Sequence, residues 1–129
     1  HDYAYDSSEF GEKYRRENYD TLYHQRRKLM AENCIYEGQP ALLTEFGGIA
    51  MQREAKDGNW GYNTGAKSEE EFLSRYKNLM DGIYAQKELQ GFCYTQLPDV
   101  QQEVNGLLYP DRSPKFEISK IKKITEHKD

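Results

Sequence analysis

The sequence lacks every pattern that would mark a metal centre or a membrane segment. Its histidines, His1, His24 and His127, have no spacing to each other or to a cysteine that would build a local zinc site. No apolar run approaches the roughly 20 residues of a membrane-spanning helix. We therefore expect no protein-held metal, no other cofactor and no membrane partner.

Cysteine is scarce, and the two that are present form no C-x-x-C pattern. Cys34 and Cys93 lie far apart in the chain, so a disulfide would require the fold to bring them together. We expect two buried thiols instead.

An excess of positive charge is also absent. Lys and Arg number 18 against 22 Asp and Glu, which gives a net charge of -4. Nucleic-acid binding through phosphate contacts requires a basic footprint, so we expect no nucleic-acid partner. The short basic runs at 26–28 and 120–123 are typical of solvated helix faces.

Apolar side chains are few for a chain of 129 residues. Hydrophobic residues make up 36%, against about 45–50% in an ordinary domain, yet 13% aromatic residues is too many for a disordered chain. The length allows one domain over residues 1–129. The chain starts at His1 rather than Met, which indicates a segment of a longer protein.

Apolar periodicity predicts three helices. The first is expected over about 8–33, and the second begins at the capping box of Ser68 and Glu71. The spacing of Tyr76 and Tyr84 places both in the core face of that second helix. The last follows Ser113 as N-cap, with proline at its first helical position.

Two short strands separate these helices. The apolar run 41–44 is typical of a strand buried on both faces, 92–95 predicts a second strand, and glycines predict a long loop over 46–65. Alternation of helices and strands favours an α/β fold with parallel pairing.

A carboxylate stands where the first strand ends. Glu45 follows that strand and precedes Gly47 and Gly48, whose backbone a ligand can approach closely. Ligands of parallel α/β proteins bind at the carboxyl ends of strands. From its position alone, Glu45 fits catalysis or, alternatively, a structural salt bridge or helix cap.

Several motifs together resemble one enzyme family. The segments 43–48, 60–62, 91–96 and 99–106 resemble, in order and spacing, the C-terminal part of the catalytic domain in glycoside hydrolase family 2, the β-galactosidase and β-glucuronidase family. The resemblance implies an α/β fold made of the C-terminal portion, about three βα units, of a TIM (β/α)8 barrel.

The resemblance also implies a retaining β-glycosidase that is β-galactosidase-like. Glu45 corresponds to the nucleophile and Tyr3 to the tyrosine whose hydroxyl holds that nucleophile. The general acid/base of the family comes from an Asn-Glu pair, and that order occurs nowhere in this sequence. Hydrolysis of the carbohydrate would therefore require the rest of the barrel and the accessory β domains of a parent chain.

The resemblance also implies further residues that contact the sugar. For each of them the alternative is a purely structural role, in packing or in a contact within its own loop. The candidate substrate-binding residues are Tyr94, Trp60, Tyr62, Gln96 and Asp99.

Two other functions are compatible with the sequence. The chain by itself is expected to be inactive, as a structural half-barrel that associates with copies of itself through open strand edges. A carbohydrate-binding module without chemistry is the second alternative. The sequence specifies neither the sugar, the linkage nor the compartment.

Overall fold

The computed structural model describes residues 1–11, 13–24, 27–51 and 58–127. Short helical turns and a small hairpin come first, and the longer elements follow. In chain order the elements are η1 (Ser7–Glu9), η2 (Arg16–Asn18), β1 (Tyr23–His24), β2 (Arg27–Lys28), β3 (Ala41–Gly47), β4 (Ile49–Met51), β5 (Tyr62–Ala66), α1 (Glu69–Ala85), β6 (Leu89–Thr95) and α2 (Ile118–Thr125).

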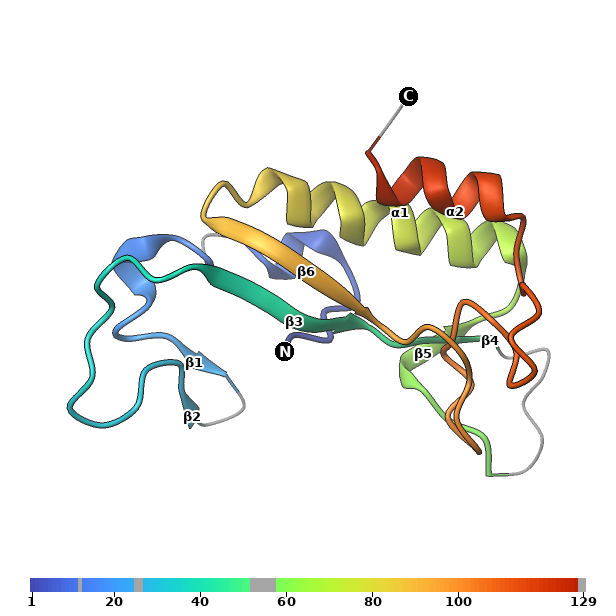
Figure 1. Ribbon diagram of the computed structural model, residues 1–129, viewed down its shortest axis with the longest axis horizontal. Helices are drawn as coiled ribbons and strands as arrows, with labels where there is room; N and C mark the ends of the chain where they lie inside the picture. Colours follow the sequence, from blue (N-terminus) through green and yellow to red (C-terminus); the bar gives the residue numbers. More distant parts are fainter. Residues whose placement is uncertain (12, 25–26, 52–57, 128–129) are drawn as a thin grey trace.

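The strands of the described ranges form three separate pairs. β3 pairs with β6 and β4 with β5, both in parallel, whereas β1 and β2 form an antiparallel pair. Both helices lie on the same side of the β3–β6 pair, and the β1–β2 hairpin projects at one end (Figure 1). The parallel pairing of the two predicted strands is thus confirmed, although both strands are longer than the apolar runs that indicated them.

An irregularity in β3 decides which of its residues face the core. Leu43 pairs with Phe92, and Phe46 pairs with Tyr94. Three residues along β3 therefore span the same length as two residues along β6, so the register shifts between these two pairs. This bulge lets both Leu43 and Phe46 be buried, while Thr44 and Glu45 between them stay exposed. The prediction of a strand buried on both faces is therefore wrong.

Helix α1 begins as predicted. Ser68 Oγ accepts a hydrogen bond from the Glu71 amide at 3.1 Å, and Glu71 Oε2 accepts one from the Lys67 amide at 2.9 Å. Tyr76 is buried, but Tyr84 is exposed, so only the first of these two core predictions is confirmed.

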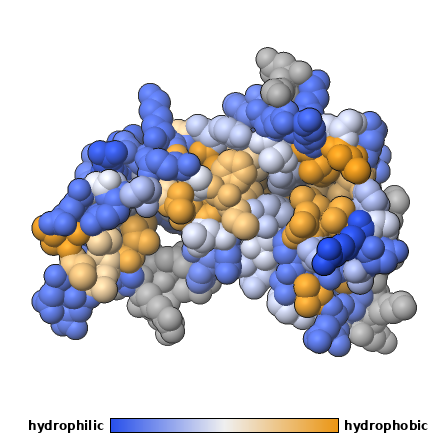
Figure 2. All heavy atoms as spheres, in the orientation of Figure 1, coloured by the Kyte–Doolittle hydropathy of each residue, from blue (hydrophilic) through white to orange (hydrophobic). Residues whose placement is uncertain are grey.

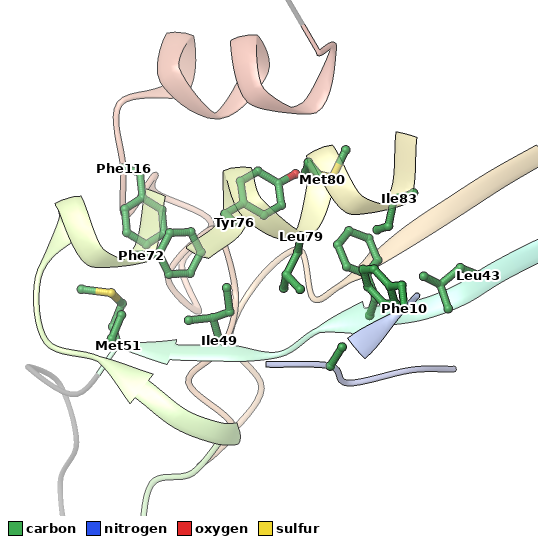
Figure 3. Close-up of a cluster of buried hydrophobic side chains, with 13 residues drawn as sticks. Phe10, Leu43, Ile49, Met51, Phe72, Tyr76, Leu79, Met80, Ile83 and Phe116 are labelled. Atoms are coloured by element: carbon green, nitrogen blue, oxygen red, sulfur yellow. The ribbon is translucent and has the colours of Figure 1, made fainter. Parts of the chain in front are cut away.

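The core lies between α1 and the strands. Phe72 and Leu79 of α1 point toward β3 and β4, whereas Tyr76 and Met80 lie on the side of α1 toward α2 (Figure 3). Burying each such side chain contributes on the order of 1.5–3 kcal/mol. The fully buried members from α1 are Phe72, Tyr76, Leu79 and Met80.

The predicted barrel segment is wrong. Across the residues that the structure describes, the chain is a small α/β domain with two α-helices and short parallel strands in two two-stranded sheets, not about three βα units of a TIM barrel. Near the N-terminus, Asp2 forms an isolated parallel bridge with Phe46 of β3.

The helix expected over 8–33 is also absent from the described part of that range. η1 ends at Glu9, two residues before Gly11, whose φ of +46° does not continue a helix, and the β1–β2 hairpin follows η2. Residue 12 and residues 25–26 of the expected helix lie outside the described residues. The helical spacing was misleading because Phe10 is buried against α1 rather than in a stripe of its own helix.

Three local predictions also need correction. Ser113 does not cap the last helix, since α2 begins at Ile118 after Glu117, and Pro114 instead forms a bridge with Leu108. Segment 46–65, expected as a loop, holds β4 and most of β5, and its residues 52–57 lie outside the described residues. Both cysteines are free, but they are exposed rather than buried.

Some large hydrophobic side chains remain at the surface. Leu97 and Ile118 are each 63% exposed. On the face drawn in Figure 2, hydrophobic residues reach the surface in several patches that hydrophilic residues separate. Scattered exposure of this kind is ordinary for folded proteins. Within the described residues, no helix has the length and apolarity needed to cross a membrane.

Candidate functional site

Glu45 lies near the carboxyl end of β3, on an exposed stretch of the strand. The bulge described above holds the backbone there, and the buried Phe46 beside it anchors the strand to the core. A carboxylate on a strand is positioned more rigidly than one on a free loop. Glu45 is therefore both accessible and fixed in direction.

The N-terminal segment runs beside Glu45. The Asp2 amide donates to the Glu45 carbonyl oxygen at 2.8 Å. The Asp2 side chain is buried, and its Oδ2 accepts hydrogen bonds from Lys13 Nζ at 2.5 Å and from the Tyr14 hydroxyl at 2.6 Å. These contacts fix the backbone immediately before Tyr3.

Tyr3 and Glu45, which the sequence placed in one site, are in direct contact. The Tyr3 hydroxyl donates to Glu45 Oε2 at 2.9 Å. Burial raises the pKa of the Tyr3 phenol well above its ordinary value, hydrogen bonding to Tyr62 and Glu45 raises it further, and a hydrogen bond with Thr95 acts in the opposite direction. Tyr3 therefore keeps its proton at neutral pH and remains a donor to the carboxylate.

Two of the predicted sugar-contact residues continue this row of side chains. The Tyr62 ring stacks on Tyr3 with centroids 3.5 Å apart and an interplanar angle of 2°. Trp60 meets Tyr62 edge-on at 5.7 Å, and its side chain is 48% exposed. Glu45, Tyr3, Tyr62 and Trp60 thus form one continuous row, which we call the aromatic row.

Tyr94 is placed differently. Its ring packs edge-on against Phe46 at 5.5 Å and Tyr76 at 5.1 Å, and its hydroxyl donates to the Asn105 carbonyl at 3.3 Å. A Cβ on Gly47 would lie 2.2 Å from this ring. The Tyr94 ring therefore packs against Phe46 of β3 and Tyr76 of α1, and it is not part of the aromatic row.

The polar residues predicted after the second strand contact their own loop. Gln96 Nε2 donates to the Glu103 carbonyl at 3.5 Å. Asp99 is buried, and its carboxylate accepts from the Gly106 amide at 2.8 Å and from Lys115 Nζ at 2.7 and 2.8 Å. Asp99 and Lys115 are thus a buried ion pair that ties the loop after β6 to the segment before α2.

Two residues of the site were not among the sequence candidates. Thr95, at the end of β6, lies near the Tyr3 hydroxyl and acts to lower the pKa of that phenol. Asn63 Nδ2 donates to the Tyr3 carbonyl oxygen at 2.6 Å. A threonine at a strand end and an asparagine after an aromatic residue are too common for the sequence to single out. Over the ranges that the structure describes, no three His, Cys, Asp or Glu residues are grouped as a metal site would require.

The Tyr62 ring packs so closely on Gly48 that no larger residue fits at position 48 without displacing the ring. The φ of Gly48 is +61°, and a Cβ built there would lie 2.4 Å from Tyr62 Cδ2. Gly48→Ala should lower the free energy of unfolding by about 1–3 kcal/mol, from left-handed strain and displacement of the ring. Urea unfolding measures this loss. Gly38→Ala is the matched control, because Gly38 also has positive φ but nothing lies within 4 Å of its Cβ position; equal losses in both variants would contradict the role of the ring contact.

Tyrosines that are buried or partly buried make the stability dependent on alkaline pH. Burial is the main cause of a raised pKa at Tyr3, Tyr14, Tyr19, Tyr76 and Tyr94. The unfolded chain would ionise them near pH 10, so their contribution to stability is complete below that pH and is lost as the pH rises above it.

We expect these five tyrosines to ionise together with unfolding. Tyrosinate absorbance and far-ultraviolet circular dichroism, recorded in one titration, should show a late absorbance step that coincides with the loss of helical signal. A single reversible ionisation of all 11 tyrosines near pH 10 with the helical signal intact would contradict this prediction.

Comparison with known proteins identifies no family. The chain matched no protein-family model, and a search of curated proteins returned no similar sequence.

Proposed function

We propose that this chain carries the nucleophile of a retaining β-glycosidase that hydrolyses O-glycosidic bonds, with a β-galactoside as the substrate class. The observation that supports the proposal most is the hydrogen bond from the Tyr3 hydroxyl to Glu45 Oε2 at 2.9 Å. The motif resemblance described in the sequence analysis points to the same two residues and the same reaction.

The proposed chemistry begins at the free oxygen of Glu45. With Oε2 held by Tyr3, Oε1 attacks the anomeric carbon, a C–O bond forms, and the bond to the leaving group breaks with its electron pair on the departing oxygen. The product is a glycosyl ester of Glu45, which water later hydrolyses with overall retention. The Tyr3 hydroxyl orients the carboxylate throughout and keeps its own proton.

The mechanism needs a second carboxyl group about 5–5.5 Å from the nucleophile to protonate the leaving group. We propose that a further segment of the parent protein supplies it, because the Asn-Glu order of the family is missing from the sequence. This chain is then one part of the catalytic unit, and the segment of the parent protein that carries the acid completes it.

We propose that Trp60 provides the apolar platform for the sugar. The half-exposed ring lies at the outer end of the aromatic row. The C–H face of a pyranose packs well on such a ring.

A substrate with a strongly activated leaving group tests the proposal without the missing acid. By itself the chain is expected to be inactive on ordinary β-galactosides, but 2,4-dinitrophenolate leaves without protonation, so 2,4-dinitrophenyl β-galactoside should still release a burst of one dinitrophenolate per chain, followed by slow turnover. Methyl β-galactoside, whose leaving group needs the acid, should not react. Absence of a burst at saturating substrate would contradict the proposed function.

A further inference from the structure

The face-to-face contact between Tyr62 and Tyr3 is the closest ring stacking among the aromatic pairs described above. Its centroids lie 3.5 Å apart, whereas Trp60 meets Tyr62 only by an edge at 5.7 Å. One face of the Tyr62 ring is therefore covered by Tyr3 and is closed to a sugar. This placement does not suit Tyr62 as a sugar platform.

The backbone on either side of Tyr62 strengthens the contact. The Tyr62 amide donates to the Gly48 carbonyl at 2.9 Å, and the ring lies directly over Gly48, where no Cβ would fit. The next residue, Asn63, has a left-handed φ of +57° and donates from Nδ2 to the Tyr3 carbonyl at 2.6 Å. Tyr62 and Asn63 thus hold Tyr3 by its ring and by its backbone.

The need for such a clamp follows from the shape of tyrosine. The hydroxyl lies at the far end of a rigid ring, so a small rotation about χ1 moves it out of hydrogen-bonding distance of a carboxylate. A stacked neighbour restricts that rotation.

We propose that Tyr62, assisted by Asn63, is a positioning residue that holds the Tyr3 hydroxyl on Glu45 Oε2. Its catalytic meaning rests on the proposed function, but the positioning itself does not. Tyr62 would act through Tyr3 and would make no contact with the reacting atoms.

Three variants test the inference. Tyr62→Leu removes the stacked ring, Tyr62→Phe keeps it, and Tyr84→Leu is the matched control, because Tyr84 stacks on His127 and does not belong to the aromatic row. The first readout is the burst with 2,4-dinitrophenyl β-galactoside, split into its maximal rate and its half-saturating concentration. The second is the nuclear Overhauser effect between the Tyr3 ring and the Glu45 γ-protons in the free protein.

For Tyr62→Leu we expect the maximal burst rate to fall by about 3- to 10-fold, since the stack contributes about one tenfold factor, with an unchanged half-saturating concentration. The Overhauser signal should weaken severalfold. Tyr62→Phe keeps the ring but lacks the hydroxyl that also hydrogen-bonds Tyr3, so its losses in both readouts should be smaller than those of Tyr62→Leu. Tyr84→Leu should match the wild type in both readouts. A raised half-saturating concentration with unchanged rate and signal would overturn the inference and make Tyr62 part of the sugar platform.

The two proposals fail in different ways. If no variant shows a burst, the glycosidase proposal fails, and the Overhauser comparison still decides the positioning. If Tyr62→Leu does not fold, Asn63→Gly removes the hydrogen bond to Tyr3 while preserving the left-handed backbone. An unchanged signal in Asn63→Gly would then overturn the clamp, and a weakened signal would support it.

Discussion

Glu45→Gln should lower the rate constant of the dinitrophenolate burst by about 10⁴-fold or more. The amide retains the shape of the side chain and still accepts a hydrogen bond from Tyr3, but its neutral oxygen is a poor nucleophile. Loss of a nucleophile has effects of this size in other covalent mechanisms. The burst is measured by stopped-flow absorbance on the same preparation as the wild type.

A variant with a shorter side chain at position 45 distinguishes the loss of the nucleophile from a loss of the folded structure. Glu45→Ala leaves space beside the anomeric carbon, so added azide should attack there, displace dinitrophenolate and give α-galactosyl azide. Glu37→Gln, an exposed glutamate outside the site, should react like the wild type. A full burst in Glu45→Gln would contradict the assignment of Glu45.

The second large effect concerns the buried ion pair. Lys115→Met is expected to lower the free energy of unfolding by about 3–5 kcal/mol, because it leaves the Asp99 carboxylate buried without its cation. Both side chains are almost inaccessible, at 1% and 4%. The free energy of unfolding of a small domain is only about 5–15 kcal/mol. The midpoint of urea unfolding should therefore move to a much lower urea concentration.

Two further variants show whether burial is the cause. Lys77→Met removes a lysine from an exposed ion pair with Asp81 at 2.7 Å, and it should cost less than about 1 kcal/mol. Adding Asp99→Asn to Lys115→Met should recover much of the loss, because the amide oxygen still accepts from the Gly106 amide and no buried charge remains. A loss under 1 kcal/mol in Lys115→Met would contradict the account.

Local signals predicted the elements whose residues are close in sequence. The cap at Ser68 and the apolar spacing after it located α1, and two apolar runs located the parallel pair β3–β6. The prediction of a helix over about 8–33 is wrong for the opposite reason. Phe10 has helical spacing to its neighbours, but long-range packing onto α1 determines its place.

The site was only partly accessible to sequence reasoning. Tyr3 and Glu45 are 42 positions apart, and only the family resemblance brought them together before the structure did. The bulge that exposes Glu45, the stack of Tyr62 on Tyr3 and the burial of Asp99 depend on contacts between distant segments. Composition and periodicity carry no information about such contacts.

Covalent trapping at Glu45 tests the central claim most directly. 2,4-Dinitrophenyl 2-deoxy-2-fluoro-β-galactoside should transfer its sugar to the carboxylate, release dinitrophenolate and leave an ester that the fluorine makes slow to hydrolyse. Intact mass followed by peptide mapping should locate one fluorogalactosyl group on Glu45, with none in Glu45→Gln. A chain that stays unlabelled, or one labelled at another residue, would contradict the claim that Glu45 is a glycosidase nucleophile.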